Sequence, residues 1–193
     1  MKKILVATHN AGKLREFAAL FAPLGIAVVS AGEMGLAEPE ETAPDFAGNA
    51  QLKARAAAKA SGIPALADDS GLCVAALDCQ PGVYSARYAA GDYSAAFARI
   101  VAVCAEKGEW RARFVCALCL AQPDGTTATF IGQAEGRIAP APEGSGGFGY
   151  DPVFVPEGYE QSYAVLGAEV KDRISHRARA VAQLLANLGS TPL

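Results

Sequence analysis

The first third of the chain alternates short apolar runs with positions spaced as on one face of a helix. Residues 3–8 form an apolar run typical of a strand, and Leu14, Phe17, Phe21 and Leu24 then recur at helical spacing up to Gly25. Residues 26–30 form a second strand-like run. This order predicts strand, loop, helix and strand.

The next segments continue the alternation after an irregular stretch. Residues 38–44 are acidic and contain two prolines, so a loop is expected there. Asp45 can cap a helix that runs to about Ser61 and carries Asn49 and Lys53 on one face at a spacing of four. Residues 65–67 predict a buried strand that ends in Asp68-Asp69-Ser70-Gly71, and residues 94–104 predict another helix.

The second half adds an antiparallel pair to this α/β pattern. Residues 111–121 and 126–134 flank Pro123-Asp124-Gly125, which favours a hairpin turn. A glycine-rich loop covers residues 144–152, and a final helix is expected from Ser175 with a buried stripe of four residues, Ala178, Val181, Leu185 and Leu188. With no linker or charge block in 193 residues, we predict one α/β domain over residues 1–193.

The amino-acid composition limits the kinds of partner that the protein is expected to bind. The net charge is −3 and the pI is near 5.4, which argues against a broad basic surface for nucleic acid and leaves a small anion as the ligand of a few local cations. The apolar run at residues 4–7 is too short for a signal peptide, and no run approaches the roughly 20 apolar residues of a membrane span. We therefore expect a cytoplasmic protein with no membrane partner.

The chain has five cysteines, an odd number without secretory context, so reduced thiols are expected. Only Cys116-x-x-Cys119 has the spacing of a ligand pair. It lies in an apolar run typical of a buried strand, where residues three apart point to opposite faces and cannot share a zinc ion.

The loop between the first strand and the first helix has the chemistry of a phosphate site. Its residues are Thr8, His9, Asn10, Ala11, Gly12 and Lys13. A helix N-terminus offers N–H groups and a positive dipole end, Thr8 and Asn10 add side-chain donors, and Lys13 adds a full charge. An ordinary capped loop is the alternative, because the spacing differs from glycine-rich phosphate loops.

The acidic pair Asp68-Asp69 is the second candidate. If the backbone stays extended there, the two carboxylates point to opposite faces, so one is expected to act and the other to support it. A carboxylate on a strand can hold Mg²⁺ and accept a proton from an attacking water, while a helix cap or a turn is the structural alternative.

Two more candidates lie near the C-terminus. In Phe148-Gly149-Tyr150-Asp151 the aromatic rings could stack on a base, or simply pack in a tight turn. Ser175-His176-Arg177 opens the last helix with Lys171 just upstream. An arginine is slightly unfavourable at a helix N-terminus, which favours a role in ligand binding, whereas a lone histidine there is usually solvated.

Together these motifs resemble one family over nearly the whole chain, the inosine/xanthosine triphosphate pyrophosphatases that remove noncanonical purine nucleotides. Six motifs occur in the family's order: Thr8-x-Asn10-x-x-Lys13, Phe46-x-x-Asn49-Ala50-x-x-Lys53-Ala54, Ala67-Asp-Asp-Ser-Gly-Leu72, Pro81-Gly-Val-Tyr-Ser-Ala-Arg-Tyr88, Gly146-Gly-Phe-Gly-Tyr-Asp-Pro152 and Ser175-His-Arg177. The resemblance implies a mixed sheet with flanking helices, two lobes around a deep central cleft, a homodimer, and Mg²⁺ as the only cofactor.

The resemblance also implies a role for each matching residue. Asp69 would be the catalytic carboxylate, and Asp69 with Glu40 or Glu41 would bind Mg²⁺; we expect one glutamate, not both. The other residues would bind a purine nucleoside triphosphate. The triphosphate would lie against Thr8 through Lys13, Lys53 and Lys171, the base against Phe148 through Asp151, His176 and Arg177, and Ser70 would also contact the substrate.

Some positions depart from the family pattern. His9 stands where a small residue is expected, Gln80 precedes Pro81-Gly82 where Ala or Gly is expected, and the segment after Tyr88 is rich in alanine. Loop conformation near Gln80 and the dimer contacts are the features these departures affect. Three other functions stay open: a pyrophosphatase for modified pyrimidine nucleotides, a non-catalytic nucleotide-binding module, and a plain interaction domain.

Overall fold

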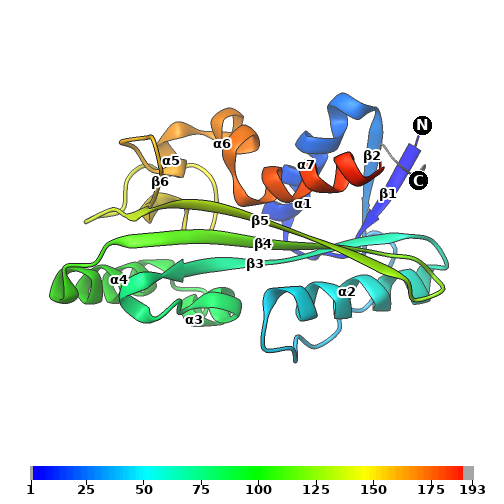
Figure 1. Cartoon of the computed structure of the whole chain (residues 1–193), viewed down its shortest axis with the longest axis horizontal. Helices are drawn as coiled ribbons and strands as arrows, with labels where there is room; N and C mark the ends of the chain where they lie inside the picture. Colours follow the sequence, from blue (N-terminus) through cyan, green and yellow to red (C-terminus); the bar gives the residue numbers. More distant parts are fainter. Residues whose placement is uncertain (1, 189–193) are drawn as a thin grey trace. The chain divides into compact units, whose positions relative to one another are not determined.

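The computed structural model describes residues 2–188 and shows an α/β fold (Figure 1). The strands are β1 (Lys2–Val6), β2 (Ile26–Ser30), β3 (Ala65–Val74), β4 (Arg111–Ala121), β5 (Thr127–Ile138) and β6 (Phe154–Pro156). The α-helices are α1 (Ala11–Phe21), α2 (Phe46–Ser61), α3 (Ser85–Ala89), α4 (Tyr93–Lys107), α5 (Tyr163–Leu166), α6 (Ala168–Ile174) and α7 (His176–Leu188).

The strands form one mixed sheet in the order β2-β1-β3-β4-β5-β6. β1 pairs in parallel with β2 and β3, whereas β5 and β6 are antiparallel. The turn between β4 and β5 is closed by the N–H of Gln122, which donates to the carbonyl of Thr126, and Gly125 has a φ of 90°. The predicted α/β class, the mixed sheet and the hairpin are therefore confirmed.

The described chain divides into two compact units. The first contains residues 2–69, 116–132 and 177–188, and the second contains residues 70–115 and 133–176. The predictions of one domain over residues 1–193, and of two lobes around a deep cleft, stay predictions.

The first unit has a separate apolar cluster on each face of its strands. One face packs on α1 and α7 through residues that include Phe17, Phe21 and Leu184, all fully buried. The other face packs on the alanines of α2, whose small side chains allow the helix to lie close to the strands. Cys116 belongs to the first cluster and Cys119 to the second, so the prediction that they cannot share a metal ion is confirmed.

The second unit is built around aromatic side chains. Phe114 of β4 stacks on His176 and packs on Phe154 and Tyr163, with ring centroids 4.7 to 6.3 Å apart. Residues of α4, including Ile100, belong to the same cluster. This core fixes the β6, α5 and α6 segment that leads to Lys171.

Helix boundaries follow the expected capping chemistry. Asp45 accepts a hydrogen bond from the N–H of Gly48 and begins α2, which ends at Ser61 as predicted. Residues 38–44 contain no helix or strand, as expected of the acidic loop. The predicted stripe of α7 is shifted, because Leu184 is fully buried and Leu185 and Leu188 are only partly buried. Leu24 is exposed because α1 ends at Phe21.

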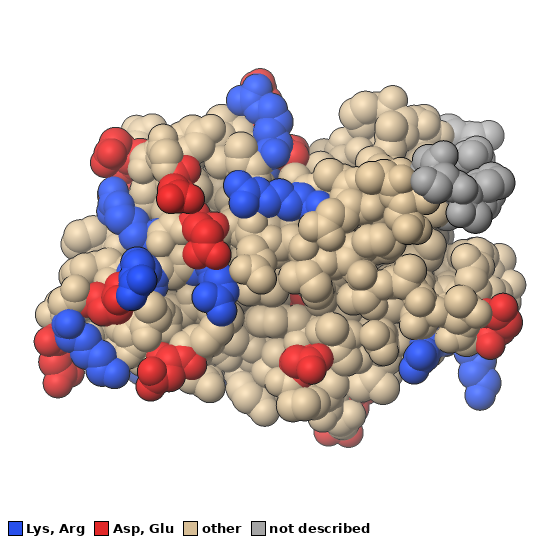
Figure 2. All heavy atoms as spheres, viewed as in Figure 1, with Lys and Arg blue, Asp and Glu red and all other residues tan. Residues whose placement is uncertain are grey.

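Two surface properties bear on partners. On the face drawn in Figure 2, basic and acidic side chains are interspersed, and no part of that face is basic alone. Within residues 2–188, no helix combines the length and the apolar character that crossing a membrane requires.

Candidate active site

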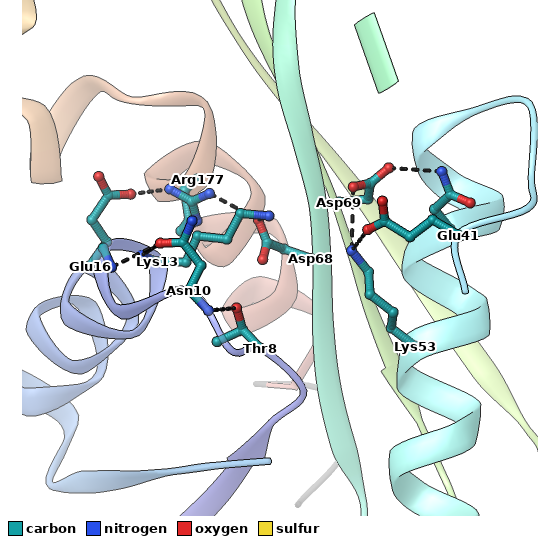
Figure 3. Close-up of polar contacts among 11 residues, drawn as sticks. Thr8, Asn10, Lys13, Glu16, Glu41, Lys53, Asp68, Asp69 and Arg177 are labelled. Carbon is teal, nitrogen blue, oxygen red and sulfur yellow. Dashed lines mark hydrogen bonds and ion pairs between the residues drawn. The ribbon is translucent and has the colours of Figure 1, made fainter. Parts of the chain in front are cut away.

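The acidic pair lies within strand β3. The sequence predicted a shorter strand, with its buried part at residues 65–67. The strand in the structure runs to Val74, so Asp68 and Asp69 lie inside an extended strand. Their side chains leave the strand on opposite sides, Asp68 toward α1 and α7 and Asp69 toward α2 (Figure 3). The prediction that the two carboxylates face different surroundings is confirmed.

Asp69 lies in a buried group with two residues of α2. Lys53 Nζ is 3.3 Å from Asp69 Oδ1 and 2.6 Å from Glu41 Oε1, and the side-chain amide of Asn49 donates to Asp69 Oδ2 at 3.2 Å. Asn49 and Lys53 are one helical turn apart, and Asp45 caps the first turn of that helix. The capped helix therefore presents one amide and one ammonium group to the carboxylate.

Burial and charge act in opposite directions on this group. Burial raises the pKa of Asp69 above 3.8, Lys53 and Lys13 oppose the rise, and Glu41 adds to it. For Lys53, burial alone would lower the pKa, but the charges of Asp69, Asp68 and Glu41 raise it above 10.5. Lys53 is consequently a buried cation held by two carboxylates, while Asp69 retains a higher proton affinity than an ordinary aspartate.

Asp68 is held by cations on the other side of the strand. Arg177 Nη2 donates to Asp68 Oδ2 at 2.9 Å, and Lys13 Nζ is 3.2 Å from the same oxygen. Arg177 Nη1 also pairs with Glu16 of α1. Burial would raise the pKa of Asp68, but Lys13 and Arg177 outweigh it and hold the pKa far below 3.8. Asp68 is thus ionised and serves as a fixed counter-charge.

Some polar groups of the loop before α1 form hydrogen bonds with the loop's own backbone. Asn10 Oδ1 accepts from the N–H groups of Gly12 and Lys13 at 2.9 and 3.1 Å, and Thr8 Oγ1 accepts from the N–H of Asn10 at 3.1 Å. For the N–H groups of Gly12 and Lys13 this favours the capped loop that the sequence left open as the alternative. His9 and Ala11 are exposed beside them.

The glycine-rich loop belongs to the second unit and is centred on Asp151. Its Oδ2 accepts from the N–H of Phe148 at 2.8 Å and pairs with Lys171 Nζ at 2.6 Å. Lys171 Nζ lies 4.4 Å from the centroid of the half-buried Phe148 ring. Gly147 has a φ of 72°, and a Cβ there would lie 2.2 Å from Asp151 Oδ2, so this position requires glycine.

Two aromatic candidates of this unit are core residues. The Tyr150 ring is buried against Tyr93 and Phe97, and its hydroxyl donates to the carbonyl of Ser85 at 2.8 Å. This favours the packing role that the sequence left open for Tyr150, whereas Phe148 keeps a partly exposed ring. His176 is buried on Phe114, so the alternative of a solvated histidine is wrong.

The remaining predicted residues are placed but not tested as ligands. Glu40 is exposed and Glu41 pairs with Lys53, so Glu41 is the glutamate that the structure brings to Asp69. Ser70 and Gly149 are half-buried in the second unit. Sequence reasoning missed Glu16, although it follows Lys13 by three residues and so shares its helix face.

The donor chemistry at Asp69 fits Mg²⁺. Glu41 and Asp69 supply hard oxygen atoms, and their two charges already hold one cation, the Lys53 ammonium. Mg²⁺ commonly takes one or two carboxylates and completes its shell with water and phosphate oxygens. Within residues 2–188, no cluster of three or more acidic, histidine or cysteine side chains offers a complete protein cage.

The fold and these groups define an α/β protein in which a buried carboxylate pairs with a lysine on each side of one strand. A family model described as the Ham1 family matches residues 4–187, and the chain therefore belongs to the Ham1 family.

Curated relatives agree over nearly the full length. A dITP/XTP pyrophosphatase of Gluconobacter oxydans is 52% identical over 185 residues, which cover 95% of this chain and 89% of the relative. A dITP/XTP pyrophosphatase of Rhodospirillum centenum is 53% identical over 188 residues, with 95% and 93% covered.

Solved structures agree as well. A HAM1 protein from Coxiella burnetii superposes with a TM-score of 0.87 at 36% identity, covering 99% of this chain and all of the other. A nucleoside-triphosphatase described as a dITP/XTP pyrophosphatase from Mycobacterium abscessus has a TM-score of 0.74 at 42% identity, covering 95% and 98%.

Proposed function

We propose that this chain hydrolyses noncanonical purine nucleoside triphosphates, dITP, ITP, XTP and dXTP, to the monophosphate and pyrophosphate. Such an activity would clear these nucleotides from the cytoplasmic pool. The observation that carries the proposal is the buried group of Asp69, Glu41 and Lys53 in a chain about half identical to dITP/XTP pyrophosphatases.

In the proposed reaction, water attacks the α-phosphorus, the bond from the α-phosphorus to the bridging oxygen breaks, and pyrophosphate leaves with the electron pair. Asp69 accepts the proton of the attacking water, and its raised pKa makes it a stronger base than an ordinary aspartate. Lys13, Lys53 and Lys171 would bind the triphosphate, whose negative charges they offset.

Mg²⁺ is the proposed cofactor, held by Asp69 and Glu41. When bound, it would supply charge stabilisation for the phosphate oxygens. Lys53 would then exchange part of its contact with the two carboxylates for phosphate oxygens. We further propose that the protein acts as a homodimer.

Base selection is proposed to rest on the oxygen at position 6 of hypoxanthine and xanthine. Arginine carries only donors, so Arg177, together with His176, can bind a carbonyl oxygen but not the amino group of adenine. Guanine shares the 6-oxo group, so a contact near position 2 must exclude GTP.

The experiment that tests the function is pyrophosphate release from ITP, XTP, ATP, GTP and dUTP, with and without Mg²⁺. We expect kcat/KM for ITP and XTP to exceed that for ATP by about 10⁴-fold. A site built for a hydrogen bond to the 6-oxo group rejects ATP, whose adenine carries an amino group at that position. Preference for dUTP or another pyrimidine would instead support the pyrimidine alternative, and binding of ITP without turnover would support a nucleotide-binding module.

A further inference from the structure

Cys73 and Cys79 are joined by a disulfide, contrary to the expectation that all cysteines are reduced. Cys73 is the penultimate residue of β3, and the chain turns back through residues 75–77 so that the two Cα atoms lie 4.1 Å apart. The turn brings the two thiols within bonding reach, which the spacing of six residues did not reveal. Cys104, Cys116 and Cys119 are free and buried.

The disulfide lines a cavity of the second unit with a volume of about 310 Å³. The polar side chains of the lining come from Arg111, Arg113 and Glu135. Cys73 is 4% exposed, whereas Cys79 is half-buried. Of the two sulfurs, that of Cys79 is therefore the one on the more accessible residue.

The two arginines of the cavity differ in their partners. Arg111 binds the carboxylate of Glu109 through Nε and Nη2, so its charge is compensated. Arg113 forms no ion pair within the described residues, and its buried Nε has no hydrogen-bond partner. Its Nη2 lies 3.5 Å from Cys79 Sγ. An uncompensated guanidinium therefore lies directly beside the more accessible sulfur.

A cation beside a sulfur attracts an anionic thiolate to it, and it also stabilises the thiolate of that same sulfur when it is the leaving group. The positive charge of the half-buried Arg113 side chain also attracts a carboxylate on the incoming molecule. We propose that Cys73 and Cys79 form a site for reversible thiol–disulfide exchange with a small thiol that carries a carboxylate.

The exchange balances in two steps. The incoming thiolate attacks Cys79 Sγ, the Cys73–Cys79 bond breaks, and the electron pair leaves on Cys73 Sγ, which takes a proton from solvent. A second thiolate attacks the sulfur of the bound small molecule and expels the Cys79 thiolate beside Arg113. Two small thiols are thereby oxidised to their disulfide and the protein disulfide is reduced; the reverse sequence forms it.

The backbone of the turn between the two cysteines has an unfavourable conformation. Asp78 and Cys79 have φ angles of 50° and 68°, a left-handed conformation that is unfavourable for residues other than glycine. The disulfide holds this turn, and the chain continues through the 3-10 helix Gly82–Tyr84 to Ser85, whose Oγ accepts from the N–H of Leu72 in β3. Reduction would release the covalent constraint on this turn.

The test measures how fast oxidised full-length protein is reduced by three thiols: 3-mercaptopropionate, 2-mercaptoethanol and cysteamine. Each rate per thiolate is divided by the rate at which the same thiol reduces a small neutral disulfide, because thiolates of different pKa differ in intrinsic nucleophilicity. Alkylation and intact mass report the two new thiols. The anionic thiol should react about threefold to tenfold faster than the cationic one, the range expected of one partly exposed charge pair. Arg113→Gln should remove this preference, and the matched variant Arg111→Gln should keep it.

A trapping experiment identifies the sulfur that is attacked. With Cys73→Ser, oxidised 3-mercaptopropionate should add one mixed disulfide, located at Cys79 by peptide mapping; with Cys79→Ser, no comparable adduct should form at Cys73. Equal normalised rates for the three thiols, or an unchanged preference in Arg113→Gln, would overturn the anionic-thiol site. Five alkylatable thiols in unfolded wild-type protein after oxidative equilibration would overturn the disulfide itself, whether or not the serine variants fold.

Discussion

The two adjacent aspartates of β3 are chemically different because of what each one touches. Asp69 pairs with one buried lysine, and the nearby negative charge of Glu41 disfavours its ionised form. Asp68 accepts a hydrogen bond from Arg177 and forms an ion pair with Lys13. Asp69 has a raised pKa and Asp68 a lowered pKa. A carboxyl group with a raised proton affinity and an ionised counter-charge thus follow one another in the sequence.

Asp69→Asn should abolish pyrophosphate release while keeping the fold. The proposed proton acceptor is lost together with one proposed metal ligand, so we expect kcat to fall by about 10⁴-fold. Stability to urea should be unchanged or higher, since Lys53 keeps Glu41 and a buried charge is removed. Near-normal turnover by the folded variant would show that the base lies elsewhere.

Asp68→Asn is the matched control, and its main effect should be on stability. Removing the negative charge leaves the buried Arg177 and Lys13 with less compensation, which should lower the free energy of unfolding by about 3 kcal/mol or more. Urea unfolding measures the change. A larger loss of turnover than in Asp69→Asn, once stability is accounted for, would exchange the roles of the two residues.

The pH dependence of stability should carry the signature of Asp68. Because its folded pKa is lowered, its contribution is fully present above the unfolded value of 3.8 and is lost as the pH falls through the folded pKa. Asp69 has the opposite sign, since a raised folded pKa favours the folded state at low pH. Urea unfolding from pH 7 to pH 3 should show a steeper acid loss in the wild type than in Asp68→Asn; parallel curves would contradict this.

Arg177→Ala should shrink the ratio of kcat/KM for ITP over ATP by about tenfold or more, and should change the ITP-to-GTP ratio much less. The ratio is the appropriate measurement, because Arg177 also pairs with Asp68 and Glu16, and its loss affects stability for every substrate alike. An undiminished preference for ITP over ATP would remove Arg177 from base recognition and leave it a structural role.

At the scale of elements, the glycine-rich loop depends on the close approach of Gly147 to Asp151. Gly147→Ala adds a Cβ that collides with Asp151 Oδ2, the same oxygen that binds Lys171. We expect KM for ITP to rise and the free energy of unfolding to fall by more than the roughly 1–2 kcal/mol that the left-handed backbone alone costs alanine.

Gly158→Ala is the matched control for this change. Gly158 has a φ of 84°, but a Cβ there meets no atom within 4 Å. It should show the backbone cost alone and normal kinetics. Equal effects of the two substitutions on KM would mean that the contact with Asp151 does not matter for the substrate.

Local patterns predicted elements well where polar and apolar positions repeat, and less well where a tertiary contact overrides them. Asp45 and the alanine-rich stretch after it gave α2 its correct bounds. The strand β3 was predicted too short, because Asp68 and Asp69 have low strand propensity and are kept in the strand by cations from α1, α2 and α7.

In the candidate site, the sequence predicted residues in local motifs but not the contacts between distant residues. Lys13, Lys53 and Asp69 stood out because their motifs are local, whereas the pairing of Asp68 with Arg177 joins residues 109 positions apart. No periodicity reports such a contact. The disulfide was missed for a related reason, since the turn between its cysteines is set by backbone conformation and not by an apolar pattern.

At the scale of the whole molecule, the proposed homodimer is open to direct measurement. Sedimentation at micromolar concentration should give a mass close to twice the 19.9 kDa of one chain. The matching mass in the presence of ITP would show that substrate leaves the assembly intact. A single-chain mass across the concentration range would contradict the dimer.

Because only the width of strand β3 separates the groups around Asp68 and Asp69, ligands that bind on its two sides should influence one another. One strand separates the two charged groups, yet Lys53 lowers the pKa of Asp68 and Lys13 lowers the pKa of Asp69 from across it. A charge added on one side of the strand therefore changes the electrostatic potential on the other side, without any movement of atoms. Since such coupling is reciprocal, a cation that binds beside Asp69 and an anion that binds beside Lys13 should each alter the affinity for the other by the same factor.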